Sequence, residues 1–490
     1  MKFAVLADLH LTDRADTVKE NVLDWALACI KAEQVDCIVS AGDLTAVGTV
    51  PAARRIMEKI RATGIPFIGT AGNAELRTPD QAEEVLKILS TPLTLKKDTV
   101  TLVMADSANG SLTADAMELL KNMKKDGPLV CVTHVPPRSW WDDAKALWLE
   151  ISGNFDLVIA GHTHLDEHGE KLEILRGQDP DKAIGGPPAV AFFEIAPDGI
   201  YKREDISFGD ADPASWSAEE RAEFLSFLGL SGMWTPLEDL AFALEHKVPC
   251  FELRAGCFSG EIEEAVKKWR TVCGKYLSVH LPSIGWKNGA VCGEEALRDT
   301  IRQSLSYGAD RLTLHVPEIR LSDLKEAYLP VLEKTAECIS EATERGVRIG
   351  IENMHTQPGV PHSFGFTPQE CQQWIDDLRE RVSDPECIGF HFDIGHARNN
   401  APHSSTEVIS NWLAALGKEI NGCHLHQVTL NNGKFENHKA LTGLYDSLIS
   451  LASFLTAWRQ KKIAHAPLFL EIREGRGPES LLALRKYFTI

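Results

Sequence analysis

Residues 156–164 read DLVIAGHTH, a short apolar run that ends in two histidines, His162 and His164. A run of aliphatic residues is typical of a buried β-strand, and the glycine after it favours a turn. The same arrangement recurs along the first 205 residues: an apolar run, then an aspartate, asparagine or histidine, then an amphipathic stretch. The repetition predicts an α/β fold with polar side chains at the carboxyl ends of its strands.

Seven potential metal ligands follow these strand-like runs. Because the carboxyl ends of parallel strands meet at one edge of a sheet, we expect the seven side chains to lie together. A carboxylate among them can bridge two ions, and such a pair of ions activates water and binds phosphoryl oxygens. The seven residues are Asp8, His10, Asp43, Asn73, His134, His162 and His164. Their oxygen and nitrogen donors predict a dinuclear site for manganese, iron or zinc.

These segments resemble the calcineurin-like metallophosphoesterases over about residues 1–205. The resemblance implies an α/β sandwich domain, with Asp43, Asn73 and His134 among its catalytic groups. In that family a histidine follows the ligand asparagine and stabilises the transition state or protonates the leaving oxygen. Here the sequence is GNAE, so Ala74 stands in the place of the histidine.

The substitution at position 74 leaves two interpretations open. Metal binding is expected to persist while general acid catalysis is lost, which costs about 10²–10⁴ in rate. The proton could instead come from His168 or from a group of the substrate. Alternatively, the domain is a metal-bound scaffold without activity of its own.

The sequence pattern changes after a predicted linker at residues 206–225. Eight strand-like runs follow, from LGLSG to LFLEIRE (468–474), and each precedes a helical segment. Eight β/α units in about 260 residues are the count and size of a (β/α)8 TIM barrel. We therefore predict two α/β domains, a sandwich at residues 1–205 and a barrel at residues 226–490.

Histidines and carboxylates also mark the strand ends of the second half. They number nine, which exceeds what one ion can use, and their mixture suits zinc or manganese. The nine residues are His280, His315, Glu352, Asp393, His396, His424, Glu436, His438 and Glu471. We expect up to three ions here. His426 is expected just behind the ligands, whereas His355, His362 and His403 are expected in loops.

The second half resembles the xylose-isomerase-like TIM barrels, which include sugar isomerases, epimerases and endonuclease IV. The resemblance implies a metal set shared by all of them, made of Glu352, Asp393, His424 and Glu471. The further residues match the three-zinc set of endonuclease IV: His280, His315, His396 in DIGH, and the pair in ENH. That pair departs from the family, because Glu436 stands where an aspartate is usual before His438.

On this resemblance the barrel is expected to hydrolyse a phosphate ester, with Glu352 and Glu471 as catalytic groups. The first alternative is a sugar or sugar-phosphate isomerase or epimerase, in which these two glutamates pass a proton beside one ion and the first domain removes phosphate. The second alternative is an endonuclease for abasic DNA. The net charge of −19 argues against a nucleic-acid partner, so a small phosphorylated or phosphodiester substrate is the main expectation.

Composition also indicates the compartment. Eleven cysteines, without a C-x-x-C pair, favour a reducing environment over a disulfide framework. No apolar stretch reaches the length of a membrane span, so we expect a cytoplasmic protein without a membrane partner. The sequence does not indicate an oligomeric state.

Overall fold

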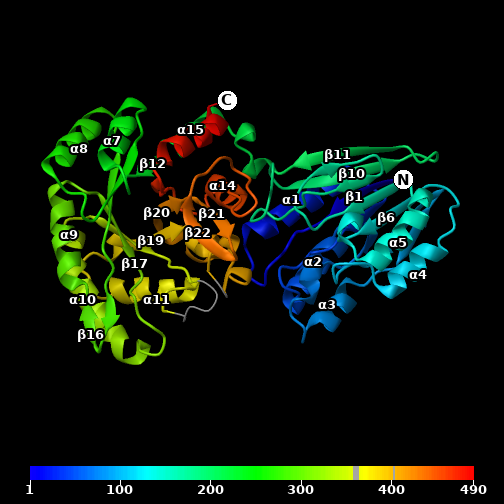
Figure 1. Ribbon diagram of the computed structural model, residues 1–490, viewed down its shortest axis with the longest axis horizontal. Coiled ribbons are helices and arrows are strands. Elements are labelled where there is room, and N and C mark those ends of the chain that lie inside the picture. The colour runs from blue at the N-terminus through cyan, green and yellow to red at the C-terminus, as the bar shows by residue number, and fades with distance from the viewer. Residues whose placement is uncertain (357–362, 401–402, 490) are drawn as a thin grey trace. The chain divides into compact units, whose positions relative to one another are not determined.

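The computed structural model describes residues 1–356, 363–400 and 403–489 and divides into two compact units (Figure 1). Unit 1 comprises Met1–Asp212 together with Tyr445–Ser453, and unit 2 comprises Pro213–Leu444 together with Phe454–Ile490. Both units are α/β, which confirms the predicted fold class. Among the described residues, no helix is both long and apolar enough to span a bilayer.

Two sheets form the centre of unit 1, with strand orders β11-β10-β1-β2-β3 and β4-β5-β6-β7-β9-β8. The first sheet contains β1 (Lys2–Leu6), β2 (Cys37–Ser40), β3 (Phe67–Gly69), β10 (Ala189–Ile195) and β11 (Tyr201–Ser207). The second contains β4 (Thr94–Lys97), β5 (Val100–Ala105), β6 (Leu129–Thr133), β7 (Leu157–Ala160), β8 (Glu167–His168) and β9 (Leu172–Ile174). Because β1, β2 and β3 are parallel, and so are β5, β6 and β7, their carboxyl ends share edges.

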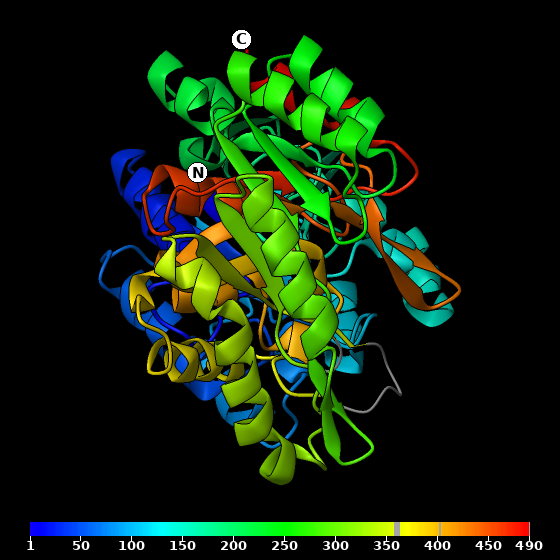
Figure 2. The same ribbon diagram turned by 90° about the vertical axis from the view of Figure 1, so that its left-hand side faces the viewer.

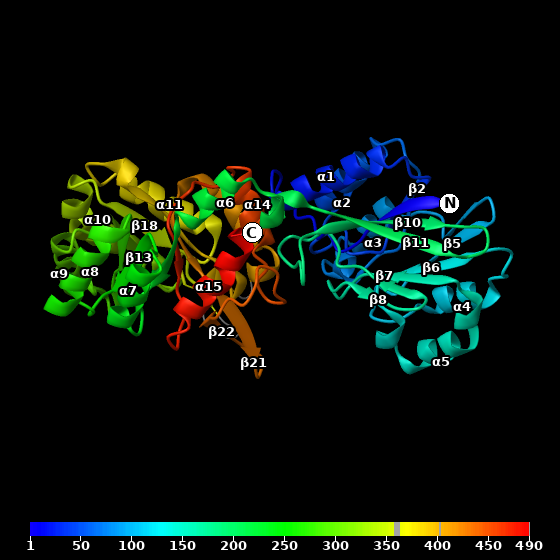
Figure 3. The same ribbon diagram turned by 90° about the horizontal axis from the view of Figure 1, so that it is seen from above.

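Helices cover the outer faces of both sheets, which makes unit 1 a four-layer sandwich (Figure 3). Helices α1 (Val18–Ala32) and α2 (Val50–Arg61) pack on the first sheet, and α4 (Ala114–Asn122) and α5 (Asp142–Ile151) pack on the second. Helix α3 (Ala82–Leu89) follows β3 in the chain. Side chains such as Phe3 and Val132 fill the space between the sheets. Burial of both faces explains why the strands are continuous apolar runs rather than alternating ones.

Eight parallel strands close the barrel of unit 2 in the order β12-β13-β14-β17-β18-β19-β20-β23. They are β12 (Leu228–Ser231), β13 (Cys250–Arg254), β14 (Tyr276–His280), β17 (Arg311–His315), β18 (Arg348–Glu352), β19 (Ile388–Asp393), β20 (Ile420–Leu425) and β23 (Leu468–Leu470). All eight overlap the predicted runs, so the barrel prediction is confirmed.

The helices of unit 2 lie outside its strands (Figure 2). They are α6 (Ala218–Leu225), α7 (Pro236–Glu245), α8 (Gly260–Val272), α9 (Glu294–Ser306), α10 (Leu324–Glu344), α11 (Pro368–Arg379), α12 (Ile394–Arg398), α13 (Ile409–Leu416), α14 (Ala452–Arg459) and α15 (Gly477–Phe488). Two hairpins interrupt the alternation: β15 (Gly285–Lys287) with β16 (Ala290–Cys292), and β21 (Gln427–Asn431) with β22 (Lys434–Lys439). The second hairpin follows β20 and carries residues of the candidate site.

Two candidate metal centres

The seven donors predicted in unit 1 come together beyond the carboxyl ends of five strands. Asp8 and His10 follow β1, Asp43 follows β2, and Asn73 begins a short 3-10 helix, η1 (Asn73–Leu76), after β3. His134 follows β6, and both His162 and His164 follow β7. The contacts between these side chains define two adjacent groups that share Asp43.

The first group contains Asp8, His10, Asp43 and His164, all of them buried. His10 Nε2 lies 3.5 Å from Asp43 Oδ2 and 4.0 Å from Asp8 Oδ1. His164 Nε2 lies 3.8 Å from the same oxygen of Asp8. The ligand atoms of Asp8, His10 and His164 all lie within 4.8 Å of one another, which is close enough to bind one ion.

The second group contains Asn73, His134 and His162, with the other oxygen of Asp43. His134 Nε2 lies 3.0 Å from Asn73 Oδ1, 3.1 Å from His162 Nδ1 and 3.4 Å from Asp43 Oδ1. His134 Nδ1 donates a hydrogen bond to the Ala41 carbonyl (2.9 Å), so Nε2 carries a lone pair.

Lone pairs of oxygen and nitrogen therefore face one another, which is unfavourable unless a cation lies among them. Turned over, the Asn73 amide would donate to both imidazoles and accept from Arg77 (2.8 Å), but an ion requires the orientation with oxygen inward. The donors of unit 1 thus fit divalent cations, in agreement with the prediction that this domain binds divalent metal.

The backbone around these donors is strained. Five of the seven have left-handed φ angles between 48° and 76°: Asp8, His10, Asp43, His162 and His164. Such conformations cost about 1–3 kcal/mol per residue outside glycine and persist where surrounding contacts enforce them. Their concentration at one edge of the sandwich indicates a functional site.

Asp43 is held by groups on the neighbouring loop. The Ala74 N–H donates to Asp43 Oδ1 (2.7 Å), and the Asp43 N–H donates to Glu75 Oε2 (3.0 Å). Glu75 also accepts from the Gly72 and Thr45 N–H groups, at 2.7 and 2.8 Å. A Cβ on Gly72 would lie only 2.2 Å from Asp43 Oδ1, so the glycine of the GNAE segment makes room for the shared carboxylate.

The imidazoles of unit 1 are held in their neutral form. Burial lowers the pKa of His10 and His164 well below the usual value, and the nearby Lys182 ammonium lowers both further. Burial, followed by Asp43, raises the pKa of Asp8 well above its usual value. The same two causes raise the pKa of Glu75 to about 7. The shifts indicate a cluster whose charged forms are costly without a counter-ion.

The place of the missing histidine is closed, because Ala74 is fully buried. His168, one predicted substitute for it, lies on β8 and contacts Glu173 Oε2 through Nδ1 (2.8 Å). No contact joins it to the seven donors within the described part of the chain.

The barrel donors form overlapping groups at the carboxyl ends of its strands. Several groups have ligand atoms within 4.8 Å of one another, among them His280 with His424 and Glu471. Three others are linked by shared carboxylates: His280 with His315 and Glu352; Glu352 with Asp393, His424 and Glu471; and Asp393 with His426, His438 and Glu471. All of these residues except His315 are buried.

Glu352 joins the first two groups. Its Oε2 lies 3.2 Å from His280 Nε2 and 3.3 Å from His315 Nε2, and its Oε1 lies 3.2 Å from His424 Nδ1. His396 Nδ1 lies 3.4 Å from Oε1 but donates to the Asn353 carbonyl (2.9 Å). Among the described residues, Glu352 Oε2 and Glu471 Oε2 are buried oxygens without a hydrogen-bond donor. Such oxygens fit a cation.

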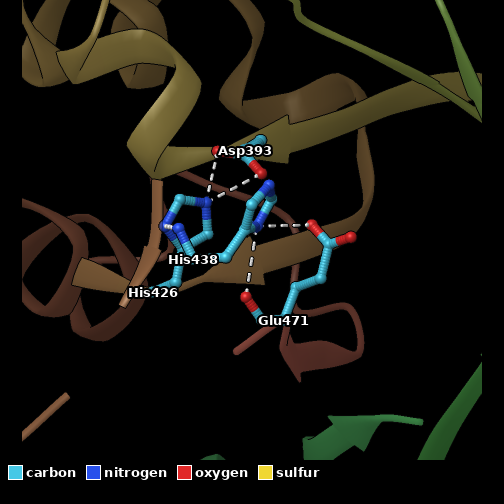
Figure 4. Close-up of side chains that lie close together, drawn as sticks. All are labelled: Asp393, His426, His438 and Glu471. Carbon is cyan, nitrogen blue, oxygen red and sulfur yellow. Dashed lines mark hydrogen bonds and ion pairs between the residues drawn. The ribbon is translucent and has the colours of Figure 1, made fainter. Parts of the chain in front are cut away.

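The third group combines residues from β19, from the segment after β20, from β22 and from the segment after β23 (Figure 4). His426 Nε2 lies 3.1 Å from Asp393 Oδ1, and His438 Nδ1 lies 3.2 Å from Glu471 Oε2. A Cβ on Gly395 would meet the His426 ring at 1.9 Å, so the glycine of DIGH is required for this packing. His426, expected behind the ligands, thus lies among the donors.

Glu436 is the predicted donor that the structure does not bring to the cluster. Its side chain is 44% exposed and pairs with Lys439 (3.0 Å). His438, two residues later, is buried and has a φ of 60°, which breaks the alternation of a regular strand. Asn437 is therefore buried next to His438, while Glu436 points to solvent.

Two buried residues of the barrel centre were missed in the sequence. Glu252 on β13 binds His424 Nε2 through Oε2 (2.7 Å), while its Oε1 accepts from Ser278 Oγ (2.9 Å) and Thr313 Oγ1 (2.8 Å). This contact fixes the tautomer of His424, so that Nδ1 faces Glu352 and Glu471. His391 packs against the His424 ring at 4.2 Å. The run CFELRA contained the signal, a carboxylate at a position that faces the barrel interior.

Charge pairs shift the pKa values of several groups in the barrel cluster in the opposite sense to those of unit 1, although burial lowers the pKa of His438. Burial lowers the pKa of His424 and His396, but the carboxylates around them outweigh burial, raising His424 well above its usual value and His396 to about 9. Burial raises the pKa of Glu252, yet His424 lowers it to about 2. His424 likewise lowers the pKa of Glu352 well below normal.

The remaining histidines of the second half occupy varied positions. His355 stacks on the His396 ring at 4.5 Å, and burial lowers its pKa to about 3. His403 begins a 3-10 turn (His403–Ser405), and His362 lies outside the described residues. Which of the gathered donors act as ligands or catalytic groups stays a prediction.

Family models match both halves of the chain. The model for calcineurin-like phosphoesterases matches residues 1–166, and the model for the xylose isomerase-like TIM barrel matches residues 240–487. A curated relative, the uncharacterized protein MJ1311 of Methanocaldococcus jannaschii, is 28% identical over 147 residues, which are 29% of this chain and 45% of that protein. The match thus spans less than half the length of the relative.

Solved structures similar to the chain include two barrels. One, a D-tagatose 3-epimerase-like protein, has 20% identity over 53% of this chain and 96% of its own, with a TM-score of 0.37. The other, a xylose isomerase domain protein from Alicyclobacillus acidocaldarius, has 15% identity over 53% of this chain and 95% of its own, with a TM-score of 0.39. At these values neither likeness bears on the reaction.

Proposed function

Because the chain belongs to the xylose isomerase-like TIM barrel family and carries a calcineurin-like phosphoesterase domain before the barrel, we propose that it is a metal-dependent hydrolase with two sites for phosphate esters. The observation that carries the proposal is the pair of donor clusters. Each gathers carboxylates and imidazoles from several strands, and each contains lone pairs that only a cation or a proton can satisfy.

In unit 1 we assign two ions to the two groups that share Asp43. Divalent ions at this position would supply an activated water and neutralise phosphoryl oxygens. The chain's own residues have distinct tasks: Asp43 holds both positions, Asn73 and His134 fix the second, and the Ala41 carbonyl orients His134. The closed position at Ala74 favours an ester with a good leaving group.

In the barrel we assign up to three ions, zinc or manganese, to the three overlapping groups. Glu352 and Glu471 each contribute to two groups, and Glu252 orients His424 toward both of them. This arrangement is the basis for proposing hydrolysis of a small phosphorylated substrate here, in the manner of the endonuclease IV branch of the family.

An isomerase or epimerase barrel is the second candidate, supported by the placement of two glutamates around one imidazole. Glu352 Oε1 and Glu471 Oε2 lie 3.2 and 3.3 Å from His424 Nδ1, so two carboxylates that could act as acid and base adjoin one ligand position. The number of ions distinguishes the candidates. Elemental analysis that gives three ions in the barrel supports hydrolysis, and one ion supports isomerisation.

Replacement of Asp43 by Asn tests the hydrolase proposal in the full-length chain. Loss of the shared carboxylate should lower turnover of a chromogenic phosphodiester by roughly 10³-fold. It should also reduce the metal content of unit 1 and leave the metal content of the barrel unchanged, measured by elemental analysis. Asp24→Asn, at a carboxylate 54% exposed on α1, is the matched control and should behave as wild type.

Full turnover by Asp43→Asn would exclude unit 1 as the source of the activity, and absence of any turnover in the wild type would favour the scaffold interpretation. We also propose a cytoplasmic location, which the eleven unpaired cysteines support.

A further inference from the structure

A lysine that belongs to neither group of donors reaches the centre of unit 1. Lys182 lies on the loop between β9 and β10, and its Nζ is 3.4 Å from His10 Nε2. Its ammonium forms no ion pair with a carboxylate in the described part of the chain. Lys182 therefore lies beside the first group of donors and does not occupy the point on which Asp8, Asp43 and His164 converge.

The loop that carries Lys182 is firmly held. Asp179 and Asp181, just before it, both pair with the fully buried ammonium of Lys19. Asp181 also accepts a hydrogen bond from Ser453 Oγ. These buried contacts lie one and three residues before Lys182 and so hold its backbone in place.

The present contact of the ammonium is incompatible with an ion on His10. The ammonium can only donate, so it uses the lone pair of His10 Nε2. An ion bound to the same nitrogen takes that lone pair. The ammonium then requires a new acceptor near the first group, and an anion bound to the ion offers oxygen atoms there.

The ammonium of Lys182 could also replace the positive charge of the family histidine, whose place Ala74 takes. The family histidine acts on the phosphoryl group or the leaving oxygen, and here Ala74 is buried without such a group. His168 is bound to Glu173 on β9. Lys182 already lies within reach of a ligand atom of the site.

We propose that Lys182 is a substrate-binding residue of unit 1. Its ammonium binds an oxygen of a phosphoryl group that is held by the ion of the first group of donors, and it provides the positive charge that the missing histidine would have provided. The inference rests on the proposed phosphoesterase site, but it concerns the binding of phosphate, which is measurable without turnover.

The test is calorimetric titration of inorganic phosphate into the full-length, manganese-loaded protein. Asp43→Asn identifies which binding event belongs to unit 1, because that event should disappear. Lys182→Met should weaken the same event about 10- to 100-fold, the loss expected for a hydrogen bond to a charged group. Elemental analysis should give the wild-type metal content. Lys182→Arg, which keeps the charge, should recover most of the affinity.

Lys31→Met removes an exposed lysine of α1 and should bind phosphate as the wild type does. Unchanged phosphate affinity in Lys182→Met would overturn the proposal. A gain of one ion in that variant would also overturn it, because the ammonium would then take the place of a metal. If phosphate binding depends on Lys182 while no ester is hydrolysed, the proposed function fails and the assignment of Lys182 stands.

Discussion

The centre of unit 1 and the centre of the barrel use the same donors but balance their charges differently. In unit 1, burial holds His10 and His164 neutral and raises the pKa of Asp8. In the barrel, buried imidazoles and carboxylates pair, so that the pKa of His424 rises and that of Glu352 falls. The first cluster thus favours the neutral forms of its imidazoles and of Asp8, whereas the second pairs charged imidazoles with charged carboxylates.

The backbones differ as well. In unit 1 most donors lie on left-handed residues of loops, while in the barrel His280, His315 and Glu352 end regular strands. His438 is the left-handed exception of the barrel cluster. The donors at the sandwich edge are thus gathered by strained loops, whereas those of the barrel are gathered mostly by strand register, with His438 of the hairpin as the strained addition.

The largest expected effect comes from Glu352→Gln, which removes the charge that links two barrel groups. Three imidazoles lie within 3.3 Å of its oxygens. We expect barrel activity to fall by about 10³-fold or more, together with loss of at least one ion by elemental analysis. Phosphodiester turnover by unit 1 should not change. Normal barrel activity in this variant would contradict the role assigned to Glu352 and weaken the distinction between the two centres.

A smaller effect is expected from Glu252→Gln. This variant tests whether a carboxylate that does not face the ions positions the His424 ring. Loss of the charged partner of His424 Nε2 should reduce metal affinity by about 10- to 100-fold, measured by competition with a chelator. Glu436→Gln is the control, because its carboxylate is exposed and pairs with Lys439. Equal losses in the two variants would indicate that Glu436 reaches the ions after all.

The smallest effect concerns stability against pH without metal. Folded-state pKa values above the unfolded ones stabilise the fold at low pH, and this stability is lost as pH rises through the folded value. For Asp8 and Glu75, whose ordinary pKa values are 3.8 and 4.5, much of this contribution to stability should be lost by pH 7. For His396, the contribution should be lost between pH 6.5 and about pH 9.

Scanning calorimetry of the full chain in EDTA should therefore show a melting temperature that falls by a few degrees between pH 6.5 and about 9. In the lower range the neutral His10 and His164, whose pKa values are lowered, act in the opposite sense, so the contribution of Asp8 is the difference between the wild type and Asp8→Asn. Asp8→Asn, which mimics the protonated carboxyl, should melt at a higher temperature than the wild type at pH 7 and at the same temperature at pH 3, and an equal melting temperature at pH 7 would refute the raised pKa of Asp8.

Much of the fold could be predicted because strand and donor signals are local. The eight barrel strands could be predicted from their apolar runs, and the seven donors of unit 1 could be predicted because each closely follows such a run. Glu252 was missed because its importance depends on the register of β13 against β14, which places it opposite Ser278. Lys182 was missed for a similar reason.

Lys182 follows no strand-end pattern, and its place depends on buried ion pairs made by residues far apart in the chain. Glu436 illustrates the opposite failure. The family resemblance implied that both Glu436 and His438 of ENH are ligands, but the left-handed backbone at His438 leaves Glu436 exposed. Local pattern thus predicts which segments reach a site, and long-range packing decides which side chains enter it.

The segment Tyr445–Ser453 belongs to unit 1, although it is encoded within the barrel half. A ribosome must therefore synthesise nearly all of the barrel before it delivers the last piece of the sandwich. Expression of the two halves separately, divided at the predicted linker, would give an amino-terminal fragment without Ser453. The carboxyl-terminal fragment would carry the segment Tyr445–Ser453 without the unit to which it belongs. The order of translation thus places the completion of unit 1 after seven of the eight barrel strands and before β23 and Glu471.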